Sequence, residues 1–323
     1  MLDSFDSINP DDYTAGFPMH PHRGIETISY VSRGKMVHRD SLGNEAGISD
    51  GEVQWMNSGS GIMHEEMVPA AERLLGVQLW LNLPAKDKMS KPSYNSIKNE
   101  DIKEIEIEGG KIRLLAGKYG EHEGYKGDYL SMDYYDIHLN ADAEVTLTME
   151  EDDSVMVFTL LGDVYIDGEH IEEKTAVKLT EGDSLTIKNG NEKAQVLYMN
   201  SRALNEPVAW AGPIVMNTQE ELQKAFFRNL EAIHFIKRNS RVLIRTTRKS
   251  IMSRGRMEAF SDGVLAIVIT IMVLKLNAPK DLTLDAVKEV FPTFLAYILS
   301  FIYVGIYWAN HHHLIKYDRF SIR

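Results

Sequence analysis

Two short stretches of the chain each place two potential metal ligands at i and i+2 spacing. His20 and His22 lie in FPMHPHRG, and His64 and Glu66 lie in GIMHEEM about forty residues later. In a β-strand, residues two apart point to the same face, so each pair can aim two ligand atoms at one point. If the two strands face each other inside a barrel, three imidazoles and one carboxylate meet at a single ion.

This ligand set predicts one bound divalent metal ion with open positions left for water or substrate. Nitrogen and oxygen ligands without sulfur favour Fe(II), and Mn, Ni, Cu and Zn are also compatible with these ligand types. HxH pairs arise by chance in a chain with 11 histidines. The alternative is therefore a polar barrel mouth whose histidines hold no ion.

The sequence pattern around these residues predicts β-structure. From Gly24 to about Met199, short apolar or alternating runs are separated by Gly, Asn and Asp turns, which is typical of all-β barrels or sandwiches. Asn82–Ser96 contains two prolines and no apolar periodicity, which indicates a crossing between two β halves. We expect one domain over 1–99 and a second over 100–236.

The second domain should close with a helix from Thr218 to about Arg238. In TQEE, Thr218 is suited to cap the helix, and Glu221 three residues later completes a capping box.

Composition excludes several classes of protein. The chain has 35 basic and 47 acidic residues, of which 14 and 6 lie from Lys237 onward, so the part before Lys237 carries −20 and the remainder +8. Such an acidic body repels phosphates, and we expect it to bind no nucleic acid. The absence of cysteine excludes disulfides, thiolate ligands and a Cys nucleophile. Met1–Asp12 carries no secretory signal, which predicts a cytoplasmic body.

The C-terminal part has the pattern of a membrane hairpin over 256–323, preceded by a basic linker over 237–255. Val290–Ala309 is without charge over about the length that crosses a bilayer, and Arg256–Leu276 contains the unbroken apolar stretch GVLAIVITIMVL but is only marginally long once Glu258 and Asp262 are counted. The basic residues before the first segment predict that both termini are cytoplasmic. Two buried core helices are the alternative interpretation.

Over about 16–227 the chain resembles the pirin family. The resemblance is carried by GFPMHPHRGIET, HRDSLGN, GEVQWMNSGSGIMHEE and NEPVAWAGPIVMNTQEELQKAF. It implies a bicupin, two cupin barrels in tandem, with one metal ion, usually iron, in the first barrel. The family ligands fall on His20, His22, His64 and Glu66.

The resemblance also bears on residues around the ligands. Glu26 occupies the position of a glutamate ligand in the wider cupin superfamily, and here we expect it to orient a ligating imidazole instead. His38, Arg39 and Asp40 match a family motif, although a polar turn explains them equally well. The second barrel usually lacks a metal. This chain has fewer residues before GFPMHPHRG than pirins usually have, and if the corresponding strands are absent, the first barrel has an unpaired sheet edge.

The C-terminal segment, at about 254–315, is similar to the first two helices of the lysosomal-type potassium channel family. RMEAFSDG matches that family's signature at Arg256, Phe260, Ser261 and Asp262. The resemblance implies pore-lining positions at Ile267, Ile271 and Leu274. A pore built from so few helices requires association of several chains, so a homo-oligomer through the membrane helices is the partner that this segment suggests.

Three functional hypotheses follow. The first is an Fe-dependent dioxygenase similar to quercetin 2,3-dioxygenase, acting on a small aromatic or enediol substrate with Glu66 as the general base. The second is a non-enzymatic metal- or redox-sensing module that binds a protein partner. The third is a potassium-channel-related membrane protein with a cupin appendage, attached to the membrane through 256–309.

Overall fold

The computed structural model describes residues 1–179 and 182–225. The chain divides into two compact units, Met1–Asn239 and Ser240–Arg323, and all described residues belong to the first. The expected basic linker, the membrane hairpin and the channel-type residues from Arg256 to Leu274 lie outside the described residues. Within the described residues, no helix has both the length and the apolar character that a membrane span needs.

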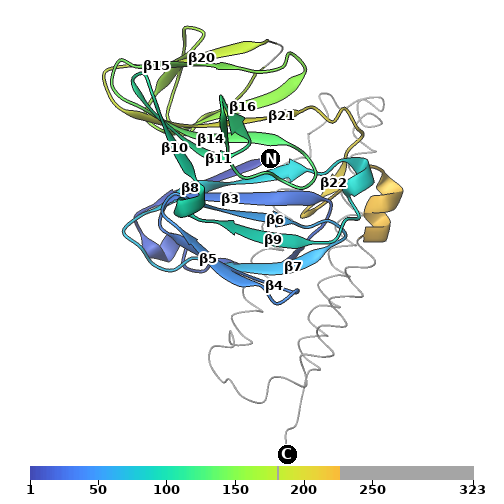
Figure 1. Cartoon of the computed structure of the whole chain (residues 1–323). Helices are drawn as coiled ribbons and strands as arrows, with labels where there is room; N and C mark the ends of the chain where they lie inside the picture. Colours follow the sequence, from blue (N-terminus) through green and yellow to red (C-terminus); the bar gives the residue numbers. More distant parts are fainter. Residues whose placement is uncertain (180–181, 226–323) are drawn as a thin grey trace, which may run out of the picture. The chain divides into compact units, whose positions relative to one another are not determined.

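The first barrel consists of two antiparallel sheets that face each other (Figure 1). Its five-stranded sheet has the order β1 (Leu2–Ser7), β8 (Leu74–Asn82), β3 (Ile25–Arg33), β6 (Glu52–Asn57) and β9 (Ser93–Ile97). Its four-stranded sheet has the order β2 (Phe17–His22), β7 (Ile62–Met67), β4 (Lys35–Asp40) and β5 (Glu45–Ser49). Three 3-10 turns connect these strands: η1 (Pro10–Asp12), η2 (Ala85–Asp87) and η3 (Asn99–Asp101).

The first strand bears on one expectation. β1 pairs with β8 from Leu2 opposite Leu79 to Ser7 opposite Leu74, so the edge of β8 is covered. A strand is therefore present before GFPMHPHRG, and the condition for an unpaired edge of β8 is not met. This strand was hard to predict because LDSFDS is short and largely polar.

The second barrel repeats the design with a six-stranded and a four-stranded sheet. The larger sheet has the order β10 (Lys103–Ile107), β11 (Gly110–Ala116), β14 (Met132–Leu139), β21 (Ala194–Arg202), β16 (Asp153–Leu161) and β19 (Ala176–Lys178). The smaller has the order β15 (Glu144–Thr148), β20 (Ser184–Asn189), β17 (Val164–Ile166) and β18 (Glu169–Ile171). A small hairpin, β12 (Lys118–Tyr119) and β13 (His122–Glu123), lies beside them. The predicted all-β, two-barrel architecture is confirmed.

The interiors of the two barrels differ in chemistry. Seventeen buried apolar residues form one cluster inside the second barrel, whereas the comparable cluster inside the first has five. The first barrel uses its remaining interior positions for buried polar side chains, among them His38, His64, Glu66 and Gln54. Because a buried polar group needs a partner, this interior is built for polar contacts or for an ion rather than for apolar packing alone.

The two barrels pack against each other through their larger sheets (Figure 1). The shared core joins side chains of β3, β6 and β8 to side chains of β11, β14 and β21, including the buried residues Tyr30, Trp55, Tyr134 and Leu197. At one end of this seam, Tyr30 Oη donates to Asp136 Oδ2 at 2.5 Å.

A C-terminal hairpin and a helix return to the first barrel. The hairpin is β22 (Ala209–Ala211) and β23 (Ile214–Met216), and residues 219–225 are helical. Thr218 Oγ1 accepts from the backbone N–H of Glu221, and Glu221 Oε2 accepts from the N–H of Thr218 at 3.1 Å. The predicted capping box is therefore confirmed.

Candidate metal centre

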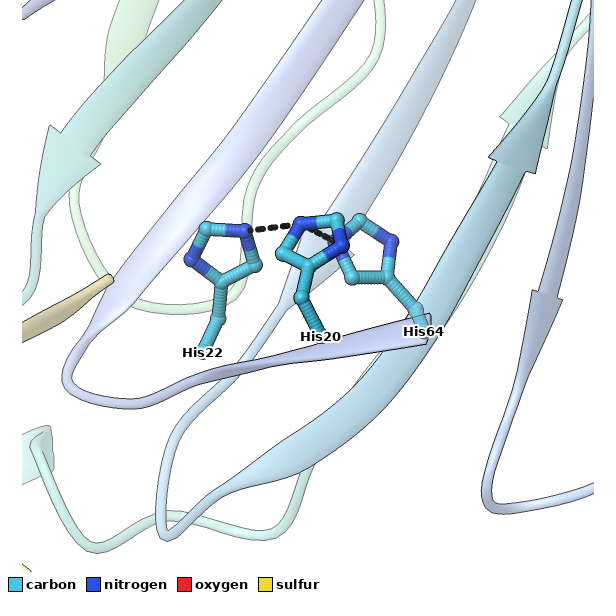
Figure 2. A group of neighbouring side chains, drawn as sticks. All are labelled: His20, His22 and His64. Carbon is cyan, nitrogen blue, oxygen red and sulfur yellow. Dashed lines mark hydrogen bonds between the residues drawn. The ribbon is translucent and has the colours of Figure 1, made fainter. Parts of the chain in front are cut away.

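Three imidazoles meet inside the first barrel. His20 on β2 is directly opposite His64 on β7, and His22 lies one pleat further along β2. The Nε2 atom of His20 is 3.1 Å from Nε2 of His22 and 3.0 Å from Nε2 of His64 (Figure 2). One ligand atom from each of the three rings lies within 4.8 Å of the others. His22 and His64 are buried, and His20 is half-buried.

Backbone carbonyls determine which nitrogen carries the proton in two of the rings. His20 Nδ1 is 2.8 Å from the carbonyl oxygen of Pro18, and His22 Nδ1 is 3.3 Å from that of Pro213. A carbonyl only accepts hydrogen bonds, so both Nδ1 atoms are protonated. In the neutral rings, the two Nε2 atoms therefore carry lone pairs.

For His64, a buried pair of side chains determines which ring nitrogen carries the proton. His38 Nε2 donates to Asp40 Oδ2 at 3.0 Å, and both side chains are fully buried. His38 Nδ1 is then unprotonated, and it accepts a hydrogen bond from His64 Nδ1–H across 3.3 Å. The ring of His38 is held in place by stacking on Tyr94, with centroids 4.0 Å apart. His64 therefore also presents an Nε2 lone pair to the common point.

This arrangement fits a metal ion. Three lone pairs that face one another repel unless a cation lies between them. Two ligands about 2.1 Å from one ion and at right angles to each other are about 3.0 Å apart, which matches the observed separations. Burial lowers the pKa of His22 to about 3 and that of His64 to about 2, with the neighbouring imidazoles adding to both shifts. Both rings are thus neutral at physiological pH, as metal ligands must be.

The carboxylate of Glu66 points into the same interior but is held by amides. Gln54 Nε2 donates to Glu66 Oε1, and Gln78 Nε2 donates to both carboxylate oxygens at 3.2 and 3.1 Å. Burial raises the pKa of Glu66 to about 7, against the lowering effect of these hydrogen bonds. The cluster of close ligand atoms consists of the three histidines and does not include Glu66. The role of Glu66 as fourth ligand therefore stays a prediction.

Glu26 lies on the other face of its strand. Ser29, which contacts Gln54 and Gln78, faces the barrel interior, whereas Glu26 alternates with the interior positions and shares the face of Ile28, which packs in the inter-barrel core. Burial raises the pKa of Glu26 to about 7, with the Trp55 indole opposing the shift and Asp128 adding to it. The structure therefore does not bring Glu26 to the three imidazoles.

From the sequence, His38 and Asp40 were named only as part of a family motif, with no role at this centre, and Pro213 was not named at all. His38 and Asp40 had the same i, i+2 spacing as the ligand pairs, so a strand through them was a readable signal. Arg39 between them points outward to Glu45 at 3.0 Å. Pro213 is 191 residues from His22, and no local pattern links the two.

The histidines of the second barrel lie outside its interior. His138 faces the first barrel and donates to buried Asp136 at 2.8 Å. His170 is exposed on β18, 3.1 Å from Asp163.

Two facing sheets in each half, with inward imidazoles in the first, define a bicupin with a candidate metal centre. Residues 1–81 match the family model described as Pirin, and residues 134–236 match the Pirin C-terminal cupin domain. Human Pirin is 37% identical over 226 residues, which cover 66% of this chain and 77% of that protein. A Pirin-like protein of Caulobacter vibrioides is 36% identical over 230 residues, covering 70% and 83%. The chain belongs to the pirin family.

One solved structure extends this comparison. The crystal structure of a quercetin 2,3-dioxygenase from Acinetobacter baumannii matches with a TM-score of 0.64 and 33% identity, covering 74% of this chain and 84% of that one. At the other end, residues 256–319 match the family model described as Endosomal/lysosomal potassium channel TMEM175.

Proposed function

We propose that this chain is a metal-dependent dioxygenase that acts on quercetin or a related flavonol or enediol. His20, His22, His64 and Glu66 would hold one divalent ion, with Fe(II) favoured by the nitrogen and oxygen ligands. The observation that carries the proposal is the convergence of three Nε2 lone pairs, each fixed by an Nδ1 partner. The similarity to a solved quercetin 2,3-dioxygenase supports the choice of substrate class.

The side chains around the centre have distinct tasks in this mechanism. An ion held by these residues would supply Lewis acidity and a template for substrate and O₂. Glu66 takes the proton of the substrate hydroxyl, and Gln54 and Gln78 hold its carboxylate in position. Trp80 packs edge-on against His22, with ring centroids 4.9 Å apart, and so contributes an apolar wall to the site.

Turnover of quercetin under oxygen tests this proposal. The Fe(II)-loaded full chain should consume quercetin and O₂ together, and Glu66→Gln should lower kcat/KM by roughly 100-fold or more because the base is lost. Glu65→Gln is the matched control, since Glu65 is the next residue on β7 and lies 3.8 Å from outward-pointing Arg39. Turnover no higher than that of His64→Ala, or equal losses in the Glu65 and Glu66 variants, contradicts the proposal.

We also propose that residues 256–319 attach the protein to a membrane. The support is the match of this segment to the channel family model and the two uncharged stretches in its sequence. The full chain should stay in the membrane pellet after alkaline carbonate extraction, whereas a chain ending at Asn239 should not. A full chain found in the supernatant contradicts the tether and leaves the dioxygenase proposal untouched.

A further inference from the structure

A cavity lies between the two barrels, at the polar end of the seam where their larger sheets pack together. It has a volume of about 390 Å³, within the usual size of small-molecule sites. One wall comes from the larger sheet of the second barrel, and Arg33, the last residue of β3, contributes from the first barrel. The imidazoles of the candidate metal centre are not among its lining residues.

Strand register places three polar side chains in one row on this wall. On β14, His138 is directly opposite Lys111 of β11 on one side and Gln195 of β21 on the other. Directly opposed residues of antiparallel strands share a face, so all three project toward the first barrel. All three line the cavity.

The charge of the cavity is opposite to that of the body around it. Residues before Lys237 carry 21 basic and 41 acidic side chains, yet Arg33, Lys111 and Lys193 all line this one cavity. Among the described lining residues, Glu106 is the single acid. Lys111 Nζ is 2.9 Å from Glu104 Oε2, which neutralises part of its charge, and Arg33 donates to the carbonyl of Ser32 at 2.9 Å.

The floor of the cavity is rigidly built. His138 Nε2 donates to Asp136 Oδ2, which is fully buried and also accepts from Tyr30 Oη. Gln195 Nε2 donates to the other oxygen, Asp136 Oδ1, at 2.8 Å. Since Nε2 of His138 carries the proton that is shared with Asp136, Nδ1 of the neutral ring is an acceptor, so His138 shapes the floor and does not donate to an anion. The side chain of His138 is 35% exposed, so a ligand can reach it.

We propose that this cavity binds a small oxyanion, a phosphate or a carboxylate, between Arg33, Lys111 and Lys193. The guanidinium of Arg33 supplies a planar pair of donors that suits either group. The ammonium groups of Lys111 and Lys193 supply point charges. This site is separate from the proposed metal centre and does not depend on the dioxygenase activity.

Titration calorimetry on the metal-loaded full chain tests the site, with inorganic phosphate and succinate as separate probes at constant ionic strength. Saturable binding of at least one probe is expected, and the stronger one identifies the ligand class. Arg33→Gln and Lys193→Gln should each weaken it roughly tenfold, the loss of one charge-assisted hydrogen bond. Lys126→Gln, an exposed lysine outside the cavity, should bind like the wild type.

The contrary results are also specific. Absence of saturable heat for both probes overturns the proposal, as does equal weakening by the cavity variants and Lys126→Gln, which indicates only general screening by surface charge. Arg33 and Lys193 are both largely exposed, so replacing either one leaves the fold intact and keeps the test meaningful.

Discussion

Each imidazole of the candidate centre is fixed at Nδ1 by a different kind of acceptor. His20 uses a neighbouring carbonyl, His22 uses a carbonyl from the distant C-terminal hairpin, and His64 uses the His38–Asp40 pair. The burial that lowers the pKa of His22 and of His64 also raises the pKa of Glu66. The ligand types and their i, i+2 spacing could be predicted from the sequence. The Nδ1 partners could not, because most of them are far from the ligands in the sequence.

Removing the partner of His64 should weaken metal binding without removing a ligand. His38→Ala should lower metal affinity by about 10- to 100-fold, because His64 then loses the acceptor that selects its tautomer. Chelator competition measures the affinity, and ¹⁵N NMR of the metal-free protein should show His64 mainly as the Nδ1–H tautomer in the wild type and as a mixture in the variant. Arg39→Ala, on the outward face of the same strand, should change neither the metal affinity nor the tautomer of His64. An unchanged metal affinity in His38→Ala would show that His38 does not select the tautomer of His64.

Glu26 gives a prediction about pH. Its pKa is raised to about 7 in the folded protein, so between about pH 4.5 and 7 the folded state keeps a proton that the unfolded state has released. Stability therefore falls as pH rises through this window, by at most roughly 3 kcal/mol. Glu26→Gln should remove this loss, so that urea unfolding shows a gain at pH 8 and little change at pH 4.5.

The matched control for that experiment is Glu100→Gln, at an exposed position. A stability gain for Glu26→Gln that is the same at both pH values would show that the carboxyl is not perturbed by burial.

At the scale of elements, β2, β7 and β4 bring the site together through their register. His20, His64 and Asp40 are cross-strand neighbours in this sheet, and His38 pairs with Glu66 in the next row. The strand pattern predicted that the two ligand pairs lie on strands, and the repeated spacing predicted that they face one interior. It did not predict that β4 is a third strand of the site, because HRDSLGN ends in turn residues that mask the strand before them.

A buried lysine holds the C-terminal hairpin against the first barrel. Lys88 Nζ donates to the carbonyls of Gly24 and Val215 at 2.9 and 3.1 Å and to Asn82 Oδ1 at 2.7 Å. Gly24 has φ +76°, and a Cβ there would lie 1.9 Å from the carbonyl oxygen of Val215, so the chain segments meet closely. The hairpin thereby holds the Pro213 carbonyl against His22.

Lys88→Met should loosen this fastening. It leaves two buried carbonyls without their donor, which should cost about 2 to 5 kcal/mol of unfolding free energy. Metal affinity should fall as well, since the Pro213 carbonyl no longer fixes His22. Lys86→Met, exposed in the same turn, is the control for urea unfolding and metal titration. If Lys88→Met loses stability but keeps its metal affinity, the hairpin does not contribute to the metal centre.

At the scale of the whole molecule, the two barrels share one apolar core but divide their tasks. The second barrel fills its interior with apolar side chains, whereas the first gives up that packing for a polar centre. The tandem β architecture was predictable from turn spacing and from the pirin resemblance. The way in which Tyr30 and Leu197 pack across the seam was not, because alternation along a strand does not say which barrel covers a face.

A substitution in the shared core should therefore destabilise both barrels together. Leu197 is fully buried in the seam, and Leu197→Ala should cost about 2 to 5 kcal/mol. In urea, loss of β circular dichroism and release of metal should occur in one transition that moves to lower denaturant in the variant. Two separated transitions in the wild type would show that the barrels unfold independently.

Metal stoichiometry of the purified, folded chain tests the central claim most directly. We expect one metal ion per chain by elemental analysis after anaerobic Fe(II) loading and desalting. We also expect loss of that ion in His20→Ala and His64→Ala, each with retained β circular dichroism. A folded wild-type protein that keeps no stoichiometric metal, or variants that keep it fully, would contradict the convergence of the three imidazoles on a single cation.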